Sequence, residues 1–138
     1  MRYLIDANIL FSALYDLESN AGRLLTMAAE DKVVLISTQH VYLEMERITT
    51  AKLGFTREEA AEILKRLPVQ WIERELYEDE LKLALKAHPD EGDASLLACA
   101  NLINCEIITG DKKLLGTKYR KVALRKLKET LDIEQKRK

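Results

Sequence analysis

Short β-rich runs alternate with longer helical patterns along the chain, and this alternation constrains the fold more than any other feature. The β-rich runs cover residues 3–5, 33–36, 69–72, 107–109 and 121–124, and the helical patterns cover residues 20–30, 38–52, 56–67, 77–87 and 93–104. Strands that are separated by helices pair in parallel and are covered on both faces. The sequence therefore predicts an α/β protein with a central parallel sheet of about five strands.

Two successive helical patterns separate the second strand from the third. Gly54 ends the first pattern, and Thr56 begins the second with Glu59 three positions later, the spacing of a capping box. We expect residues 38–67 to form a helical hairpin attached to the sheet.

The composition is that of one globular domain, which we expect to span residues 1–138. Hydrophobic residues make up 47% and charged residues 33% of the chain, a balance that excludes collagen-like and disordered classes. Asp6 interrupts the first apolar run, so we expect neither a secretion signal nor a membrane span. Cys99 and Cys105 fit buried thiols in a reducing compartment better than a disulfide. These features predict a cytoplasmic protein.

Basic residues gather near the C-terminus, although the formal net charge is only −1. Residues 118–138 hold nine Lys or Arg against three acids. A basic helical tail at 125–138 could help to hold a polyanion near an acidic site. The sequence favours the plainer alternative, a solvated helix whose Leu124, Leu127 and Leu131 dock on the domain.

Three aspartates stand where an apolar run ends or a helical pattern begins. Asp6 closes the first β-rich run, Asp111 follows the fourth, and Asp93 opens the last long helical pattern. Each could be a helix N-cap, because Asp is a preferred capping residue. The carboxyl ends of parallel strands meet at one edge of a sheet, so the three side chains could also converge there on a hard metal ion. We expect the shared site, since Ser or Thr would have capped the helices as well.

Glu44 is the fourth candidate acid, and it lies inside a helical pattern. Val41, Met45 and Ile48 define the apolar face of this helix, so that Glu44 borders the face and Glu46 points to solvent. A border position just after the second strand lets the Glu44 carboxylate lean over the edge of the sheet.

Other polar residues near these acids have open roles. Asn8 could hydrogen-bond a carboxylate or stabilise a turn, and Thr109 could offer its hydroxyl to the site or serve as an ordinary strand residue. Asp90 could support the site indirectly. His40 and His88 are isolated from each other and from the cysteines, which supports neither a zinc site nor a catalytic triad, so we expect both to be spectators.

Two other kinds of site are disfavoured. The chain has no G-x-G-x-x-G or G-x-x-x-x-G-K motif, so a nucleotide-binding loop is not expected. A phosphatase with an aspartate nucleophile would need a second acid two residues after Asp6, where Asn8 stands.

Four motifs, in this order along nearly the whole chain, resemble the signature of the PIN-domain ribonuclease family. They are Leu4-Ile5-Asp6-Ala7-Asn8-Ile9-Leu10, Glu44, Asp93-Ala94 and Thr109-Gly110-Asp111-Lys112. Within the family, a stand-alone domain of this length is most similar to the VapC-type toxins of toxin–antitoxin pairs. The resemblance implies a three-layer α/β/α, Rossmann-like fold and endonucleolytic cleavage of RNA that depends on Mg²⁺ or Mn²⁺.

By position, the resemblance implies four catalytic, metal-binding acids and two supporting residues. The acids are Asp6, Glu44, Asp93 and Asp111, and the supporting residues are Asn8 and Thr109. One or two divalent ions held there can make a nucleophile from water and neutralise the leaving oxygen.

The resemblance also implies partners for the hairpin, either an antitoxin or a second copy of the chain in a homodimer. Phe55, Ile63 and Leu64 are the apolar candidates for such an interface, unless they pack on the domain's own sheet. The alternative from another class is a non-catalytic interaction or RNA-binding protein that keeps the PIN fold.

Overall fold

The computed structural model describes residues 1–137, which form five strands and eight α-helices. In chain order these are β1 (Arg2–Ile5), α1 (Ala7–Tyr15), α2 (Asn20–Ala29), β2 (Val34–Thr38), α3 (Gln39–Leu53), α4 (Arg57–Arg66), β3 (Val69–Ile72), α5 (Glu78–Ala87), α6 (Glu91–Ile103), β4 (Glu106–Ile108), α7 (Lys112–Leu115), β5 (Leu124–Arg125) and α8 (Leu127–Gln135), with a 3₁₀ helix, η1 (Arg74–Leu76), between β3 and α5.

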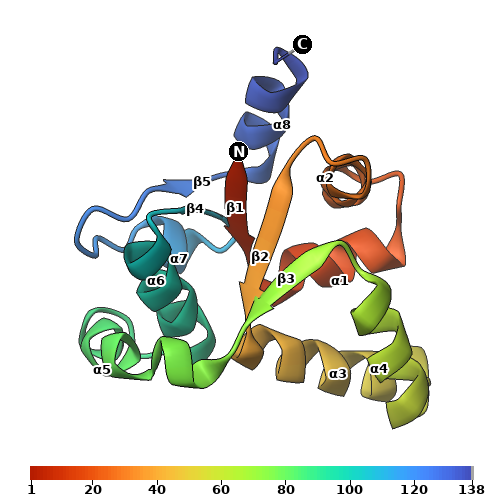
Figure 1. Ribbon diagram of the computed structural model, residues 1–138, viewed down its shortest axis with the longest axis horizontal. Coiled ribbons are helices and arrows are strands. Elements are labelled where there is room, and N and C mark those ends of the chain that lie inside the picture. The colour runs from red at the N-terminus through yellow and green to blue at the C-terminus, as the bar shows by residue number, and fades with distance from the viewer. Residues whose placement is uncertain (138) are drawn as a thin grey trace.

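All five strands are parallel and lie in the order β3-β2-β1-β4-β5. The chain builds outward from β1 to β3, then crosses back and adds β4 and β5 on the other side of β1. Helices α1, α2 and α4 lie on one side of the sheet and α5 and α6 on the other (Figure 1). The sequence prediction of a three-layer fold with a parallel sheet is confirmed.

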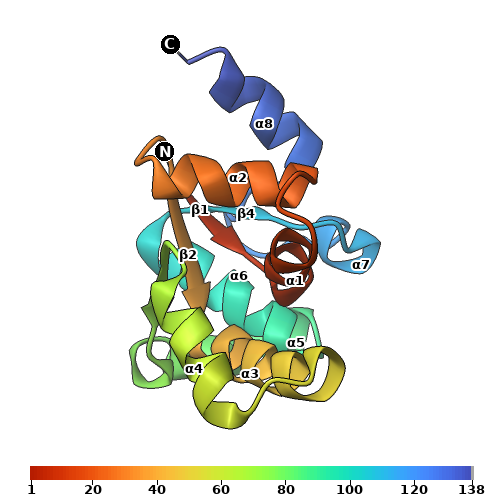
Figure 2. The same cartoon turned by 90° about the vertical axis from the view of Figure 1, so that its right-hand side faces the viewer.

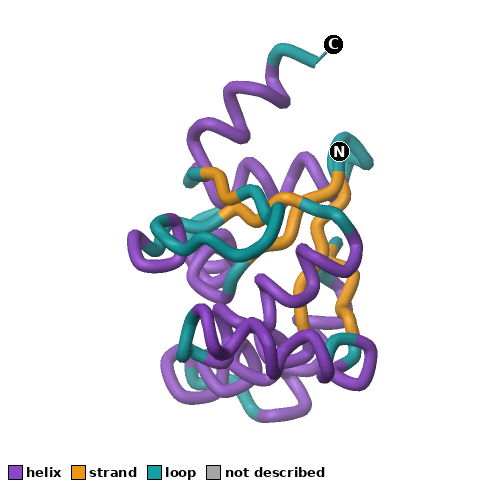
Figure 3. The backbone as a smooth tube through the Cα atoms, turned by 90° about the vertical axis from the view of Figure 1, so that its left-hand side faces the viewer, coloured by secondary structure: helices purple, strands orange, loops and turns teal. Residues whose placement is uncertain are grey.

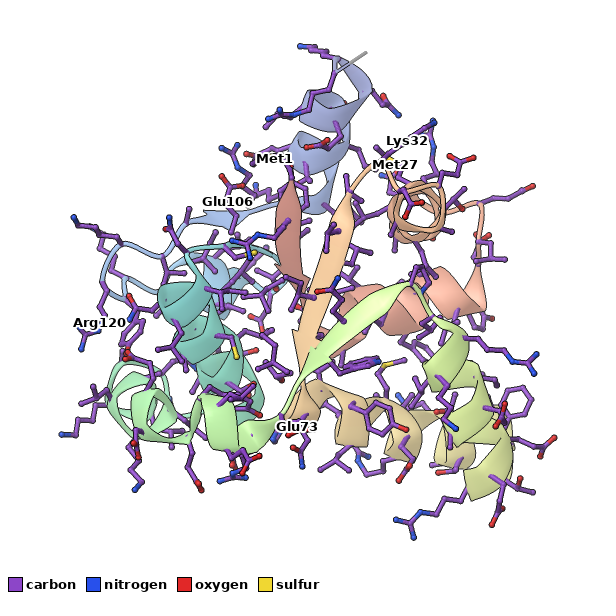
Figure 4. The ribbon with its side chains drawn as sticks, in the orientation of Figure 1. Met1, Met27, Lys32, Glu73, Glu106 and Arg120 are labelled. Atoms are coloured by element: carbon purple, nitrogen blue, oxygen red, sulfur yellow. The ribbon has the colours of Figure 1, made fainter. Side chains whose placement is uncertain are left out.

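The amino and carboxyl ends of the strands mark opposite edges of the sheet. Met1 and Glu106, at the amino ends of β1 and β4, lie at one edge, and Glu73, which follows β3, lies at the other (Figure 4). Helix α3 lies beyond the carboxyl end of β2 (Figure 2). The carboxyl edge of the sheet is therefore where side chains from successive strand ends and from α3 can meet.

The core fills the space between the sheet and its two helical layers. Leu4, Leu35 and Ile107, from the three central strands, are each at most 1% exposed. Because helices cover both faces, the buried positions of these strands follow one another directly rather than alternating with exposed ones. Cys99 and Cys105 are buried free thiols, as expected from the sequence.

The hairpin forms as predicted, and its apolar side belongs to the core. Thr56 and Glu59 complete the capping box of α4, and Gly54 ends α3 with a φ of +73°, a backbone conformation that favours glycine. Leu64 is fully buried, so it is not available as an interface residue. Of the three apolar candidates, Phe55 is 37% exposed and Ile63 is half-buried.

The C-terminal helix α8 docks on α2 and projects beyond the rest of the molecule (Figure 3). Leu131 is buried, Leu124 and Leu127 are half-buried, and Tyr3 donates its hydroxyl hydrogen to Glu134. This packing agrees with the alternative in which the tail is a solvated helix whose three leucines dock on the domain. Lys138, the end of the predicted tail, lies outside the described residues.

Several elements differ from the sequence prediction. The fifth strand is Leu124–Arg125 rather than 121–124, because a turn precedes it in which the Val122 N–H donates to the Tyr119 carbonyl and Arg120 has a φ of +49°. Helices α1 and α7 were not predicted as elements. None of the helices within residues 1–137 has the length and apolar character needed to cross a membrane.

Candidate metal and phosphodiester site

Asp6 caps helix α1 and also lines a pocket with the other acids. The helix cap and the shared site are therefore both true of this residue. It follows β1 and is only 6% exposed; its Oδ1 accepts the Ile9 N–H of α1 at 3.0 Å, and its Oδ2 accepts the Thr109 hydroxyl at 2.5 Å. Burial raises the pKa of Asp6, and the nearby Asp111 carboxylate adds to the rise. The bonds from Thr109 and Ile9 lower its pKa and so favour the ionised carboxylate.

Thr109 and Asp111 follow β4 and lie close to Asp6. The Thr109 hydroxyl accepts the Asp111 N–H at 3.0 Å while it donates to Asp6. Asp111 caps α7, accepting N–H groups from Lys113 at 2.8 Å and Leu114 at 3.4 Å. Because the chain leaves β1 in one direction and β4 in the other, these residues flank the switch point of the sheet, the usual place for a ligand in open α/β folds.

Asp93 does not open α6, contrary to the sequence prediction. The helix begins at Glu91, and Asp90 is its N-cap, with Asp90 Oδ1 accepting the Asp93 N–H at 2.9 Å. Since Asp90 satisfies that donor, the Asp93 carboxylate is free to face the site. Burial raises the pKa of Asp93 to about 6, with smaller contributions in the same direction from Asp90, Asp111 and Asp6.

His88, which was expected to be a spectator, contacts Asp93. Its Nε2 lies 3.4 Å from Asp93 Oδ2, and its Nδ1 accepts the Asp90 N–H at 3.4 Å. With Nδ1 acting as acceptor, the proton of the neutral ring resides on Nε2 and faces the carboxylate. The ring is 8% exposed. His40 also lies close to the pocket wall. A Cβ atom added to Gly92, a residue of that wall, would be 3.2 Å from the Cδ2 atom of His40.

Glu44 reaches the site from α3, as its position on the helix predicts. It is half-buried, next to the buried Val41 and Met45. Glu46 was expected to face solvent, but its side chain is only 19% exposed and lies 3.4 Å from Arg57 Nε of α4. The ion pair with the second helix of the hairpin explains the difference.

One small pocket, of about 140 Å³, gathers all four predicted acids. Its lining is Asp6, Ala7, Asn8, Val41, Glu44, Asp90, Gly92, Asp93 and Asp111. Thr109 does not line the pocket but donates a hydrogen bond to Asp6, which does. Asn8 lies on the wall with an exposed side chain.

The chemistry of this pocket fits a hard divalent cation. Carboxylate and amide oxygens are the ligands that Mg²⁺ and Mn²⁺ prefer, and the pocket wall offers no thiol or imidazole. Within residues 1–137, however, no three acids, histidines or cysteines already stand at coordination distance from one point. Repulsion from Asp90, Asp111 and Asp6 adds to the effect of burial on the pKa of Asp93, so the carboxylates repel one another when no cation is present.

Sequence reasoning missed one residue of this site, His88. The signal was its place two residues before Asp90, in the segment that leads into α6. A single histidine has no partner at a diagnostic spacing, so no sequence pattern connected His88 with Asp93.

Comparison with known structures supports the fold. The chain is similar to PAE2754 from Pyrobaculum aerophilum (TM-score 0.64, 21% identity, covering 98% of this chain and 90% of that one). It is also similar to VapBC2 from Rickettsia felis bound to a DNA fragment from its promoter (TM-score 0.62, 16% identity, covering 91% and 98%) and to VapBC-1 from nontypeable Haemophilus influenzae (TM-score 0.56, 17% identity, covering 93% and 99%). No curated protein matches the sequence.

A family model described as PIN domain matches residues 4–134. The matched segment contains all four predicted acids and every strand beyond the first two residues of β1. The chain therefore belongs to the PIN domain family.

Proposed function

We propose that the protein is a divalent-metal-dependent endoribonuclease that hydrolyses RNA phosphodiester bonds. The observation that carries the proposal is the convergence of Asp6, Glu44, Asp93 and Asp111, from four separate parts of the chain, on one pocket at the switch point of the sheet. A bound Mg²⁺ or Mn²⁺ ion supplies a Lewis acid for the phosphoryl oxygens and lowers the pKa of water.

The residues of the chain divide the remaining tasks. Asp6 and Asp111 are the direct metal ligands, Asp93 coordinates or positions water, and Glu44 acts through water or at a second ion. Thr109 holds the Asp6 carboxylate in place with its hydroxyl. His88, which does not line the pocket, orients Asp93 through its contact with the carboxylate, as partners of metal ligands commonly do.

We also propose that the protein is the toxin of a toxin–antitoxin pair and works in the cytoplasm. Two of the similar structures are VapBC proteins, and a Klebsiella pneumoniae protein with 20% identity and a TM-score of 0.59 comes from a toxin–antitoxin complex. The hairpin of α3 and α4 is the expected contact for an antitoxin or a second copy. Its available apolar residues are Phe55 and Leu43, which is 52% exposed, rather than the buried Leu64.

The proposed activity is tested with Asp6→Asn, Asp93→Asn and Asp111→Asn. Asparagine caps helices about as well as aspartate, so residues that act only as caps would change stability by a few tenths of a kcal/mol. If they bind metal, Mn²⁺ should raise the melting temperature of the wild type, and each variant should lose most of that rise together with RNA cleavage. Asp132→Asn, at an exposed position on α8, is the matched control.

Cleavage is measured on several single-stranded RNAs with Mn²⁺ or with a chelator. Variants that keep both the Mn²⁺-induced rise and the cleavage would show that the acids are caps. Absence of cleavage by the wild type, with normal partner binding, would favour the non-catalytic interaction protein.

A further inference from the structure

A second hollow adjoins the acid pocket on the α1, α2 and α8 side. It has a volume of about 320 Å³ and shares two wall residues, Asn8 and Asp111, with the acid pocket. By contrast, the hollow between α2 and α8 near Met27 and Lys32 and the one near Met1 and Glu106 share no residue with the acid pocket. A ligand in the acid pocket that extends past Asn8 and Asp111 therefore enters the adjoining hollow directly.

The walls of this hollow are chemically unlike those of the acid pocket. Ile9, Ala21 and Leu127 make its apolar sides, while the Asn8 amide and the Ser12 hydroxyl lie on it as hydrogen-bonding groups. Gly110 adds no side chain, and a Cβ built there would meet nothing within 4 Å. Apolar sides with a few polar groups suit a flat heteroaromatic ring, whose faces are apolar and whose edges donate and accept hydrogen bonds.

Four lysines are sequence neighbours of residues that line this hollow. Lys112 and Lys113 directly follow Asp111, and Lys126 and Lys128 flank Leu127. All four lysines are exposed, and none of them forms an ion pair within residues 1–137. Phosphates that leave the acid pocket toward α7 and α8 therefore meet unpaired cations.

We propose that the hollow lined by Asn8, Ser12, Ala21 and Leu127 binds the base of the nucleotide next to the phosphate in the acid pocket. The proposal rests on the proposed nuclease function and narrows its substrate to an unpaired RNA strand. A base can enter the hollow only after it leaves the stack of a duplex, and single strands present their bases without that cost.

The test fills the hollow without touching the acids. Ser12 is an exposed residue of α1, so Ser12→Phe adds a ring to the hollow without entering the core. Ala29→Phe, at an exposed position on α2 outside both hollows, is the matched control. Both changes are made in full-length Asp6→Asn protein, so that binding is measured without cleavage.

The probe is a short single-stranded RNA with 2-aminopurine placed at one position after another. We expect its emission to change on binding at one position only. Ser12→Phe should abolish that change and weaken binding about fivefold or more, the lower end of what one base contact contributes. Ala29→Phe should do neither. RNA with an abasic residue at that position should bind equally well to Asp6→Asn protein with and without Ser12→Phe.

Three results would overturn the proposal. The first is a folded Ser12→Phe protein that binds the intact strand as tightly as the Ala29→Phe protein does; Ser12→Leu serves as a second variant if the Ser12→Phe protein melts early. The second is equal affinity for duplex RNA. The third is a Ser12→Phe protein that keeps RNA binding but loses a co-expressed antitoxin, because the hollow would then hold a protein segment. Failure of the nuclease proposal would show instead as an absence of cleavage by wild-type protein with Mn²⁺.

Discussion

Thr109 joins two of the acids through one hydroxyl group. It donates to Asp6 and accepts the N–H of Asp111, and it is completely buried. A valine of nearly the same shape would leave the Asp6 carboxylate and the Asp111 N–H without this partner, and buried groups that lose a hydrogen bond cost about 1–3 kcal/mol.

Thr109→Val should therefore lower the free energy of unfolding by about 1–3 kcal/mol and weaken Mn²⁺ binding. Chemical denaturation and the Mn²⁺-induced shift in melting temperature measure the two effects. Thr109→Ser keeps the hydroxyl and is the control, which should retain most of the Mn²⁺ shift. If valine binds Mn²⁺ as well as serine does, the hydroxyl has no part in holding Asp6.

The raised pKa of Asp93 makes the metal-free protein sensitive to pH. The folded-state pKa is about 6 and the ordinary value is 3.8, so between these two values the folded protein holds a proton that the unfolded chain has lost. Stability then falls as pH rises from about 4 to 6, because the folded state binds more protons over that range.

Asp93→Asn removes this titration. In chelator, the variant should have nearly the wild-type melting temperature at pH 4 and a higher one at pH 7. Asp132→Asn, which makes the same substitution at an exposed position on α8, is the control. A difference between Asp93→Asn and wild type that stays constant from pH 4 to pH 7 would show that the Asp93 carboxylate is not strained by burial.

At the scale of elements, long amphipathic patterns were predictable and short apolar ones were not. Helices α3, α4 and α5 lie within one or two residues of their predicted ends, because each has a distinct apolar face and a recognisable start or stop. Helix α1 has apolar residues on most of its surface, so its sequence shows no helical period. Only tertiary packing distinguishes such a run from a buried strand.

The start of α6 shows how a local ambiguity was resolved. Asp90 and Asp93 are both plausible caps in the sequence, and the choice between them depends on which carboxylate meets the free N–H groups of the first turn. The structure gives the cap to Asp90 and leaves Asp93 for the pocket. Contact with His88 depends on that choice, so it could not be predicted either.

Helix α2 is positioned by a close approach at Gly22. A Cβ at this residue would lie 2.2 Å from the Leu17 carbonyl oxygen, which belongs to the backbone that connects α1 to α2. Gly22→Ala should therefore destabilise the protein by about 1–3 kcal/mol, because the backbone must shift. Gly116→Ala, where the nearest atom would be 3.4 Å away and φ is −83°, should change stability far less. Denaturant melts of the two variants compare the effects, and equal stability would mean that the connection yields easily.

At the scale of the whole molecule, the order of strands decides where the acids meet. The sequence placed Asp6 and Asp111 after strands, and parallel pairing sends both to one edge of the sheet. That much followed from the alternation of strands and helices. The adjoining hollow did not, because Ile9, Ala21 and Leu127 come from three helices whose mutual packing no local pattern specifies.

The arrangement of the molecule also divides the basic tail into two parts. Lys126 and Lys128 flank Leu127, the residue of α8 that lines the hollow adjoining the acids, whereas the helix then runs to a C-terminus that projects away from the sheet (Figure 3). Only the first part of the tail can contact a strand held at the acids. The possibility that the basic tail helps to hold a polyanion near the acids therefore applies only to the start of α8.

Replacing both lysines by glutamine should therefore weaken the binding of single-stranded RNA to Asp6→Asn protein and reduce its salt dependence. Each phosphate contact on a single strand contributes about 0.7 to the slope of log affinity against log salt concentration, so the slope should become shallower by about 1.4. Lys82→Gln with Lys86→Gln makes the same charge change at exposed positions on α5, across the sheet, and should leave the slope unchanged. Titrations of fluorescent RNA at several salt concentrations measure both. Equal slopes for the two double variants would mean that RNA responds to the net charge of the protein rather than to the lysines at the start of α8.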